Sequence, residues 1–151
     1  MFKLSSTYGI WIAIVLIAYF LLLKLVGLHQ YPAFSIFNGI IYGVGLYMSI
    51  KAYRTRTTDW KYEKGFEIGL FTGGIATIIF TVFMAIYMYQ IDGVFAANIL
   101  ESWSLDYDLG ASMLLVSMLI MGFATTLVLT LAFMQLHKKS WNTPDGNRNI
   151  L

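Results

Sequence analysis

Four long stretches of this sequence carry almost no charge, and they constrain the fold more than any other feature. They are residues 8–28, whose one charge is Lys24, and residues 33–50, 68–91 and 109–136. A helix of roughly 20 residues crosses the hydrocarbon core of a bilayer, and backbone amides cannot stay unpaired in lipid. The sequence therefore predicts an all-α integral membrane four-helix bundle forming one domain over residues 1–151. We expect transmembrane helices at about residues 8–28, 32–53, 63–91 and 109–137.

The overall composition agrees with a membrane protein. The chain is 58% hydrophobic and 12% charged, whereas soluble domains average about 45–50% apolar and about 25% charged residues. The chain contains no cysteine, which excludes disulfides, thiolate metal sites and cysteine nucleophiles.

The basic residues are distributed unevenly along the chain, and this predicts its orientation. Nine of the ten precede the first apolar stretch, follow the fourth, or lie between the second and third, whereas residues 92–109 contain four acidic residues and no basic one. Because lysine and arginine are retained on the cytoplasmic side, we expect both termini inside (N-in/C-in), with residues 138–151 as a polar cytoplasmic tail. The segment "VFAANILESW" (94–103) of the outer loop is compatible with a short interfacial helix.

The basic residues on the predicted inner side suggest one class of partner. We expect them to contact anionic lipid headgroups rather than nucleic acid. These residues are Lys51, Arg54, Arg56, Lys61, Lys64, Lys138 and Lys139.

Glycines recur at helical spacing in two of the predicted helices. Gly65, Gly69 and Gly73 are four residues apart and therefore share one helix face, and Gly39 and Gly43 form a second such pair. Small residues let helices approach closely in lipid, where the hydrophobic effect contributes little to association. The glycines thus predict a helix-packing interface. It either joins the second and third helices within one bundle, which the sequence favours, or serves a homo-oligomer or a membrane-protein partner.

Glu67 stands just before the third apolar stretch and has two interpretations. At 100° per residue it lies about 200° around the helix from Gly65, on the opposite face. At headgroup depth it would be a favourable acidic residue near a helix start, paired with Lys64. Deeper in the bilayer it would be a functional carboxylate for an ion or a proton. The first interpretation is favoured because none of the four apolar stretches contains an acidic partner.

Residues with catalytic or metal-binding chemistry are sparse. His29 and His137 are expected at opposite membrane faces and so cannot share a metal. Glu101, Asp106 and Asp108 lack the spacing of a calcium loop, and no nucleotide-binding motif is present. We therefore expect no enzyme activity, no cofactor and no bound metal.

The third predicted helix also carries a family resemblance. The basic loop ends in "YEKGFEIGLFTGGIATIIFTVF" (62–83), which includes the pattern G-F-x-x-G at residues 65–69. With four predicted helices and an aromatic, charged outer loop, the chain resembles the uncharacterised bacterial membrane family called domain of unknown function 4199. This resemblance implies the inner membrane of a Gram-negative bacterium, typically one of the Bacteroidota. It supplies no activity and no site.

The sequence leaves two functions open. The first is a non-catalytic accessory or scaffolding subunit of a membrane complex, or a homo-oligomer. The alternative is a small oligomeric transporter or channel with Glu67 near the pathway. Polar residues lining a wet cavity would favour the alternative, but the sequence does not place them. The residues in question are Asn38, Thr72, Thr77 and Thr81.

Overall fold

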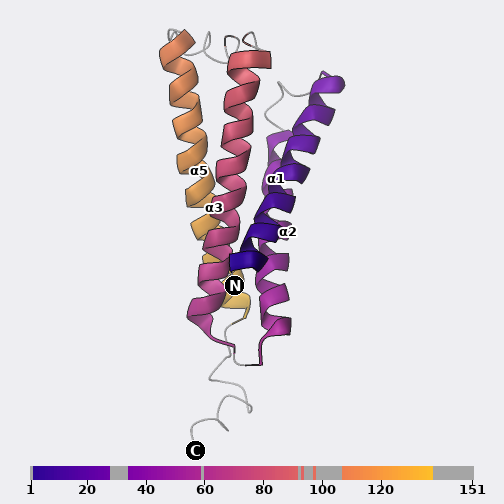
Figure 1. Cartoon of the computed structure of the whole chain (residues 1–151), viewed down its shortest axis with the longest axis vertical. Coiled ribbons are helices and arrows are strands. Elements are labelled where there is room, and N and C mark those ends of the chain that lie inside the picture. Colours follow the sequence, from indigo (N-terminus) through magenta and orange to yellow (C-terminus); the bar gives the residue numbers. More distant parts are fainter. Residues whose placement is uncertain are drawn as a thin grey trace, which may run out of the picture.

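The described part of the chain forms four long helices that alternate in direction (Figure 1). The computed structural model describes residues 2–27, 34–58, 60–91, 93, 97 and 107–137, and no strand occurs among them. The long helices are α1 (Phe2–Leu25), α2 (Ser35–Arg56), α3 (Tyr62–Ile86) and α5 (Tyr107–Leu136). A π-helical segment, η2 (Tyr87–Ile91), extends α3. The start of α1 and the end of α5 lie towards the same end of the bundle as the α2–α3 connection.

Three of these helices are long and apolar enough to cross a membrane. They are Phe2–Leu25, Tyr62–Ile91 and Gly110–Leu136, so the prediction of a multi-pass membrane protein is confirmed to that extent. The helix α2 has 22 residues but is less apolar than the other three. Its sequence includes serines, an asparagine, tyrosines and glycines, and it ends in "KAYRTR". The helix α1 begins at Phe2, earlier than the apolar stretch suggested, because a polar turn precedes that stretch and is helical as well.

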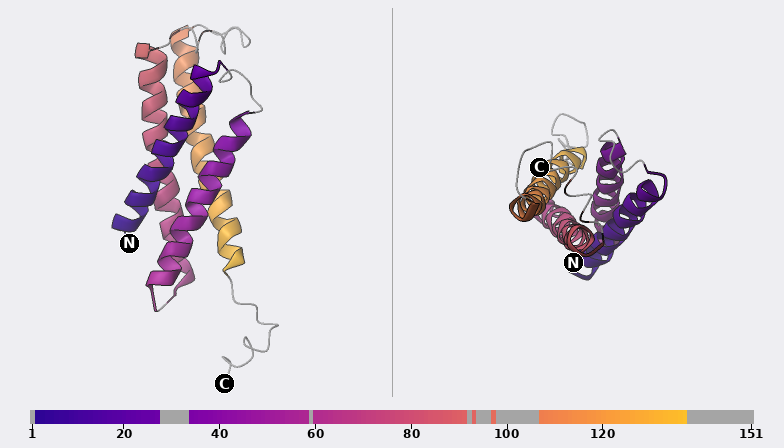
Figure 2. Two further views of the ribbon diagram at one scale, coloured as in Figure 1. Left: turned by 90° about the vertical axis from the view of Figure 1, so that its right-hand side faces the viewer. Right: turned by 90° about the horizontal axis from the view of Figure 1, so that it is seen from above.

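The helix α3 lies at the centre of the packing. Viewed end-on, α3 stands between α1 and α5, and α2 stands beside α1 (Figure 2). It packs against all three other long helices, most extensively against α1 and α5. A mid-bundle cluster buries Ile12 and Leu16 of α1, Tyr42 and Leu46 of α2, and Ala76 of α3.

A second hydrophobic cluster fills the end of the bundle near η2. It buries Phe20, Met84, Tyr87, Met88 and Leu114, and the Phe20 and Tyr87 rings meet edge to face with centroids 4.9 Å apart. Lys24, the one charge in the first apolar stretch, places its Nζ 4.5 Å from the centre of the Tyr87 ring. A cation over an aromatic face is stabilised by the ring quadrupole, so this lysine is accommodated against a buried aromatic side chain.

Two glycines bring α1 close to its neighbours. A Cβ added at Gly9 would lie 2.8 Å from the Thr72 carbonyl oxygen of α3, and one added at Gly45 of α2 would lie 2.7 Å from Ile12 Cδ1 of α1. Real Cβ atoms essentially never come so near, so only glycine permits these approaches. Neither position continues a glycine pattern in its own helix as regular as that of α3, so residue spacing does not mark either of them as a close contact.

Candidate functional site

The glycine stripe of α3 faces α5. A Cβ added at Gly69 would lie 2.7 Å from Thr130 Oγ1, and one added at Gly73 would lie 2.6 Å from Thr126 Oγ1. The two helices are antiparallel, so four residues forward on α3 correspond to four residues back on α5. The sequence favoured α2 as the neighbour of this stripe, but α5 occupies it.

The same register continues in both directions, and beyond Gly73 the glycine lies on α5 and the threonine on α3. Further along α3, Thr77 packs against Gly122 of α5, where an added Cβ would lie 2.7 Å from Thr77 Oγ1. Towards the other end, Gly65 meets Met134, whose sulfur would lie 3.0 Å from an added Cβ. We call this contact the glycine–threonine seam. It is formed by Gly69, Gly73 and Thr77 of α3 and by Gly122, Thr126 and Thr130 of α5.

The glycines of α2, Gly39 and Gly43, were expected to pack against α3, but they do not. Gly39 is exposed, and an added Cβ would meet no atom within 4 Å. At Gly43 it would make ordinary contacts with Leu129 and Phe133 of α5, at 3.7 and 3.8 Å. This pair therefore does not face the stripe of α3, because α5 already covers that stripe.

A buried group of hydroxyls lies at the middle of the seam. The Tyr42 hydroxyl of α2 lies 2.8 Å from the Gly73 carbonyl oxygen and 2.9 Å from Thr77 Oγ1, and it also contacts Thr126 Oγ1. Thr126 Oγ1 in turn lies 2.7 Å from the Gly122 carbonyl oxygen. The hydroxyls of Tyr42, Thr77 and Thr126 have three protons for these four contacts. At least one proton is therefore shared between two acceptors. This Tyr42 network links α2, α3 and α5.

The structure locates the polar residues whose surroundings the sequence left open. Thr72, Thr77 and Thr81 of α3 are buried, and Thr77 belongs to the Tyr42 network. Asn38 of α2 is partly buried. The hydroxyls of Thr72 and Thr130 have no hydrogen-bond partner among the described residues. Sequence periodicity alone could not have found the network, because its members come from three helices.

Glu67 lies in the second turn of α3 and pairs with Lys64. The Lys64 Nζ is 3.1 Å from Glu67 Oε2 and 3.3 Å from Oε1, and the two side chains are 42% and 43% exposed. A pair three residues apart on an exposed helix surface contributes only about 0.2–0.5 kcal/mol. The ion pair is therefore a weak contributor to stability.

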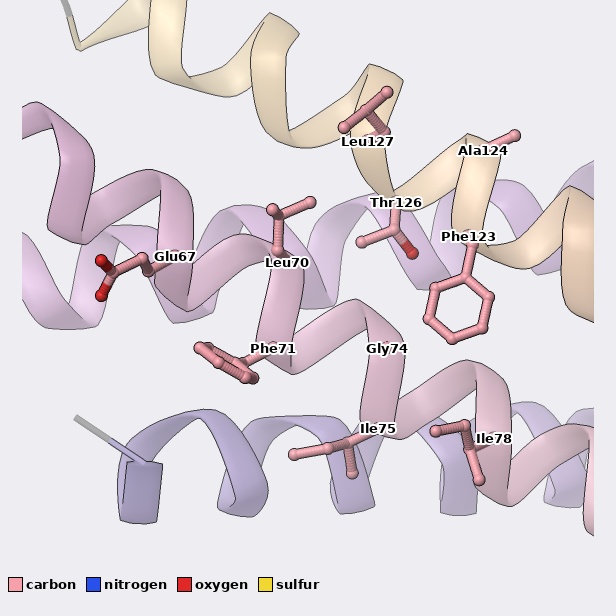
Figure 3. A pocket seen from close by; sticks show the side chains of 10 residues that line it. All are labelled: Glu67, Leu70, Phe71, Gly74, Ile75, Ile78, Phe123, Ala124, Thr126 and Leu127. Atoms are coloured by element: carbon pink, nitrogen blue, oxygen red, sulfur yellow. The ribbon is translucent and has the colours of Figure 1, made fainter.

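Glu67 also stands at one end of an apolar groove between α3 and α5 (Figure 3). We call it the α3/α5 groove, and its volume is about 800 Å³. Large exposed side chains border it, namely Phe71 and Ile78 of α3 and Phe123 and Leu127 of α5. Gly74 lies between them without a side chain, which leaves the groove hollow. Any occupant must present an apolar surface over nearly the whole groove.

A second group of side chains gathers where α5 ends. The Arg54 guanidinium of α2 lies 3.1 Å from His137 Nδ1, and since arginine only donates, Nδ1 accepts and the ring proton sits on Nε2. The His137 ring stacks on Tyr47 at 5.8 Å and meets Trp60 edge-on at 5.9 Å. The sequence assigned Arg54 to lipid headgroups, whereas the structure directs its guanidinium to His137. Burial, and then the charge of Arg54, lower the pKa of His137.

This lowered pKa predicts a pH dependence of stability. In the unfolded chain His137 titrates near its ordinary value of 6.5, so as pH falls through that value the unfolded state binds more protons than the folded state. The contribution to stability is therefore complete above about pH 6.5 and declines as pH falls towards the lower folded pKa. We expect the wild-type protein in detergent to lose thermal stability as pH falls below about 6.5, and His137→Gln to lack this loss because glutamine does not titrate. An identical pH profile for wild type and variant would contradict the assignment.

The remaining predicted residues divide into two groups. The first group is exposed near the connected ends of α2 and α3, and it consists of Lys51, Arg56 and Lys61. Others lie outside the described residues, or have side chains that the structure does not describe. They are His29, Glu101, Asp106, Asp108, Lys138 and Lys139, together with nearly all of the expected interfacial helix at 94–103.

A model of the family described as "Protein of unknown function (DUF4199)" matches residues 7–139. No curated protein and no solved structure matches the chain. The matched segment includes the glycine–threonine seam, the Tyr42 network and the α3/α5 groove.

Proposed function

The chain belongs to the DUF4199 family of proteins of unknown function, and we propose that it is a non-catalytic accessory subunit that receives a helix of a partner membrane protein. The α3/α5 groove is the observation that carries this proposal. It is a hollow of about 800 Å³ whose walls are almost entirely apolar. An amphipathic or transmembrane helix laid into an apolar groove is a recurring mode of recognition.

The proposed setting is the inner membrane of a bacterium, of the Bacteroidota type, with both termini in the cytoplasm. The distribution of basic residues supports this orientation, because lysine and arginine are retained inside. We place α2 in the membrane as a fourth span. Its exposed Ile36, Ile40, Val44 and Met48 are four residues apart and form an apolar row suited to lipid.

The proposed partner is a different protein rather than a second copy of this chain. The surface best suited to self-association, the glycine stripe of α3, is already covered by α5 of the same chain. The α3 glycine stripe, which the sequence allowed as an oligomer contact, is filled by the α5 threonines. The Glu67 carboxylate at the end of the groove adds one polar feature. A basic or hydroxyl group on the partner, at headgroup depth, would complement it.

Site-specific photocrosslinking tests this proposal. A photoreactive phenylalanine analogue is introduced at Phe71 or Phe123, which border the groove, and at Ile36 of α2 as an exposed control outside it. We expect both groove positions to capture the same protein in native membranes, and the control position not to capture it. Capture of lipid alone at the groove positions, or equal capture at Ile36, would contradict the proposal. Crosslinks between two copies of the chain would replace the foreign partner with a homo-oligomer.

The alternative function is a small oligomeric transporter or channel with Glu67 near the pathway. The partly exposed carboxylate at the mouth of a groove is the observation that favours it. Against it, the Thr77 and Tyr42 hydroxyls, which a wet pathway would use, bond to other protein groups. Replacing Glu67 with glutamine would abolish flux in reconstituted vesicles if this alternative holds. Retained flux would reject it, and Lys64→Gln provides the control for loss of the ion pair alone.

A further inference from the structure

A basic pocket lies between the beginning of α1 and the end of α2. Its volume is about 410 Å³, and it is lined by Lys3, Leu4 and Thr7 of α1 and by Tyr53, Arg56 and Thr57 at the end of α2. None of these lining residues is acidic. Two cationic side chains and several hydroxyls therefore border one small hollow.

The charge of Lys3 is poorly matched to its place in a helix. Lys3 stands in the first turn of α1, which contains no acidic residue. A helix N-terminus carries a partial positive charge that disfavours a cation and favours an anion. Arg56 stands in the last turn of α2 and adds a second positive charge to the pocket. A bound anion would offset both side-chain charges and the partial positive charge at the start of α1.

An apolar groove of about 470 Å³ follows along the same two helices. Trp11 and Val15 of α1 and Val44 and Met48 of α2 are exposed along it. Leu4 of the basic pocket shares one face of α1 with Trp11 and Val15, because the spacings of seven and eleven residues correspond to whole helical turns. The pocket and this groove, which we call the α1/α2 groove, are thus placed end to end along α1.

We propose that the basic pocket and the α1/α2 groove together bind one anionic phospholipid. Lys3 and Arg56 hold the phosphate by charge-assisted hydrogen bonds, and the Tyr53 and Thr57 hydroxyls donate to its remaining oxygens. The Trp11 ring and the aliphatic side chains of the groove contact an acyl chain. A tryptophan at this position suits the boundary between headgroups and hydrocarbon. This inference is independent of the protein partner proposed above and requires only that α1 and α2 lie in a bilayer.

Native mass spectrometry of the full chain in mild detergent tests the proposal. Phosphatidylglycerol, phosphatidylcholine and inorganic phosphate serve as separate probes. We expect phosphatidylglycerol to remain bound in preference to phosphatidylcholine. The double variant Lys3→Gln with Arg56→Gln should weaken this binding about twenty-five-fold, because each basic side chain near a lipid surface is worth roughly a factor of five. Lys51→Gln is the comparison for Lys3→Gln and Arg56→Gln taken singly. It removes one exposed charge expected at the headgroups of the same end of the bundle, but Lys51 does not line the pocket, so this change should weaken binding less than either of the other two.

Further variants separate the headgroup from the acyl chain. Trp11→Ser should weaken phosphatidylglycerol binding, whereas the conservative pair Lys3→Arg with Arg56→Lys should retain it and show that the fold tolerates changes at these positions. If Lys51→Gln weakens binding as much as either single change in the pocket, diffuse surface charge replaces the proposed site. If inorganic phosphate binds as well as the lipid and Trp11→Ser has no effect on lipid binding, the pocket is a free-phosphate site and the lipid proposal is overturned.

Discussion

Replacing Gly73 with leucine is expected to destabilise the bundle strongly. An added Cβ would lie 2.6 Å from Thr126 Oγ1 and 2.8 Å from the Tyr42 hydroxyl oxygen. The rest of the leucine side chain would have to separate α3 from α5 and displace Tyr42. Overpacking a tight contact costs about 1–3 kcal/mol or more, which exceeds the gain of up to about 1 kcal/mol from removing a helical glycine. We therefore expect a net loss of about 1–2 kcal/mol.

Gly39→Leu is the matched control for this prediction. It makes the same substitution in a helix of the same bundle, but at an exposed position where an added Cβ meets no atom within 4 Å. Unfolding of both variants is measured in detergent by circular dichroism against temperature or added sodium dodecyl sulfate. We expect Gly39→Leu to match or slightly exceed wild type. Equal stability of the two variants would show that the glycine–threonine seam is not a close contact.

Gly69→Leu extends the test along the seam. An added Cβ at this position meets Thr130 just as one at Gly73 meets Thr126, so the destabilisation should be of similar size. The Tyr42 hydroxyl is not among the nearest atoms at Gly69, so this variant reports on the seam with less disturbance of the Tyr42 network. A much smaller effect at Gly69 than at Gly73 would indicate that Gly73→Leu destabilises the bundle mainly by displacing Tyr42, rather than by separating α3 from α5 at the seam.

Removing the Tyr42 hydroxyl is the second change with a large expected effect. In Tyr42→Phe, the hydroxyls of Thr77 and Thr126 lose a buried partner, while the ring still fills its place among Ile12, Leu46 and Ala76. Leaving buried polar groups without a partner costs about 1–3 kcal/mol in water-soluble proteins, and hydrogen bonds between membrane helices average about 0.6 kcal/mol. Because several contacts are lost together, we expect a destabilisation of about 1–2 kcal/mol.

Tyr89→Phe is the control for the loss of a tyrosine hydroxyl. The Tyr89 hydroxyl lies 3.2 Å from Ser112 Oγ at an exposed site, where solvent or headgroups can replace the bond. We expect a change within about 0.5 kcal/mol for this variant. The double variant Tyr42→Phe with Thr126→Val should cost less than the sum of the single changes, because both residues belong to one network. Additive effects, or wild-type stability for Tyr42→Phe, would refute the Tyr42 network.

Several features of the fold and the site could be read from the sequence. The lengths of the uncharged stretches predicted helices, because lipid leaves the backbone no other way to satisfy its hydrogen bonds. The spacing of Lys64 and Glu67 predicted their proximity, since residues three apart are neighbours on any helix. The spacing of Gly65, Gly69 and Gly73 predicted a smooth helix face. Each of these features is local and is contained within a single helix.

The contacts between helices could be identified only from the tertiary structure. A helix that is apolar on every side has no hydrophobic pattern to show which face turns inward. The sequence therefore could not assign the α3 stripe to the threonines of α5, and it placed Gly39 in an interface although that residue is exposed. The Tyr42 network and the contact of Arg54 with His137 each join residues more than thirty positions apart. The sequence by itself determined which segments are helical and where charge is tolerated, because these depend on the surrounding solvent. Only the packed bundle decided which helices meet, because close packing depends on the shapes of both surfaces.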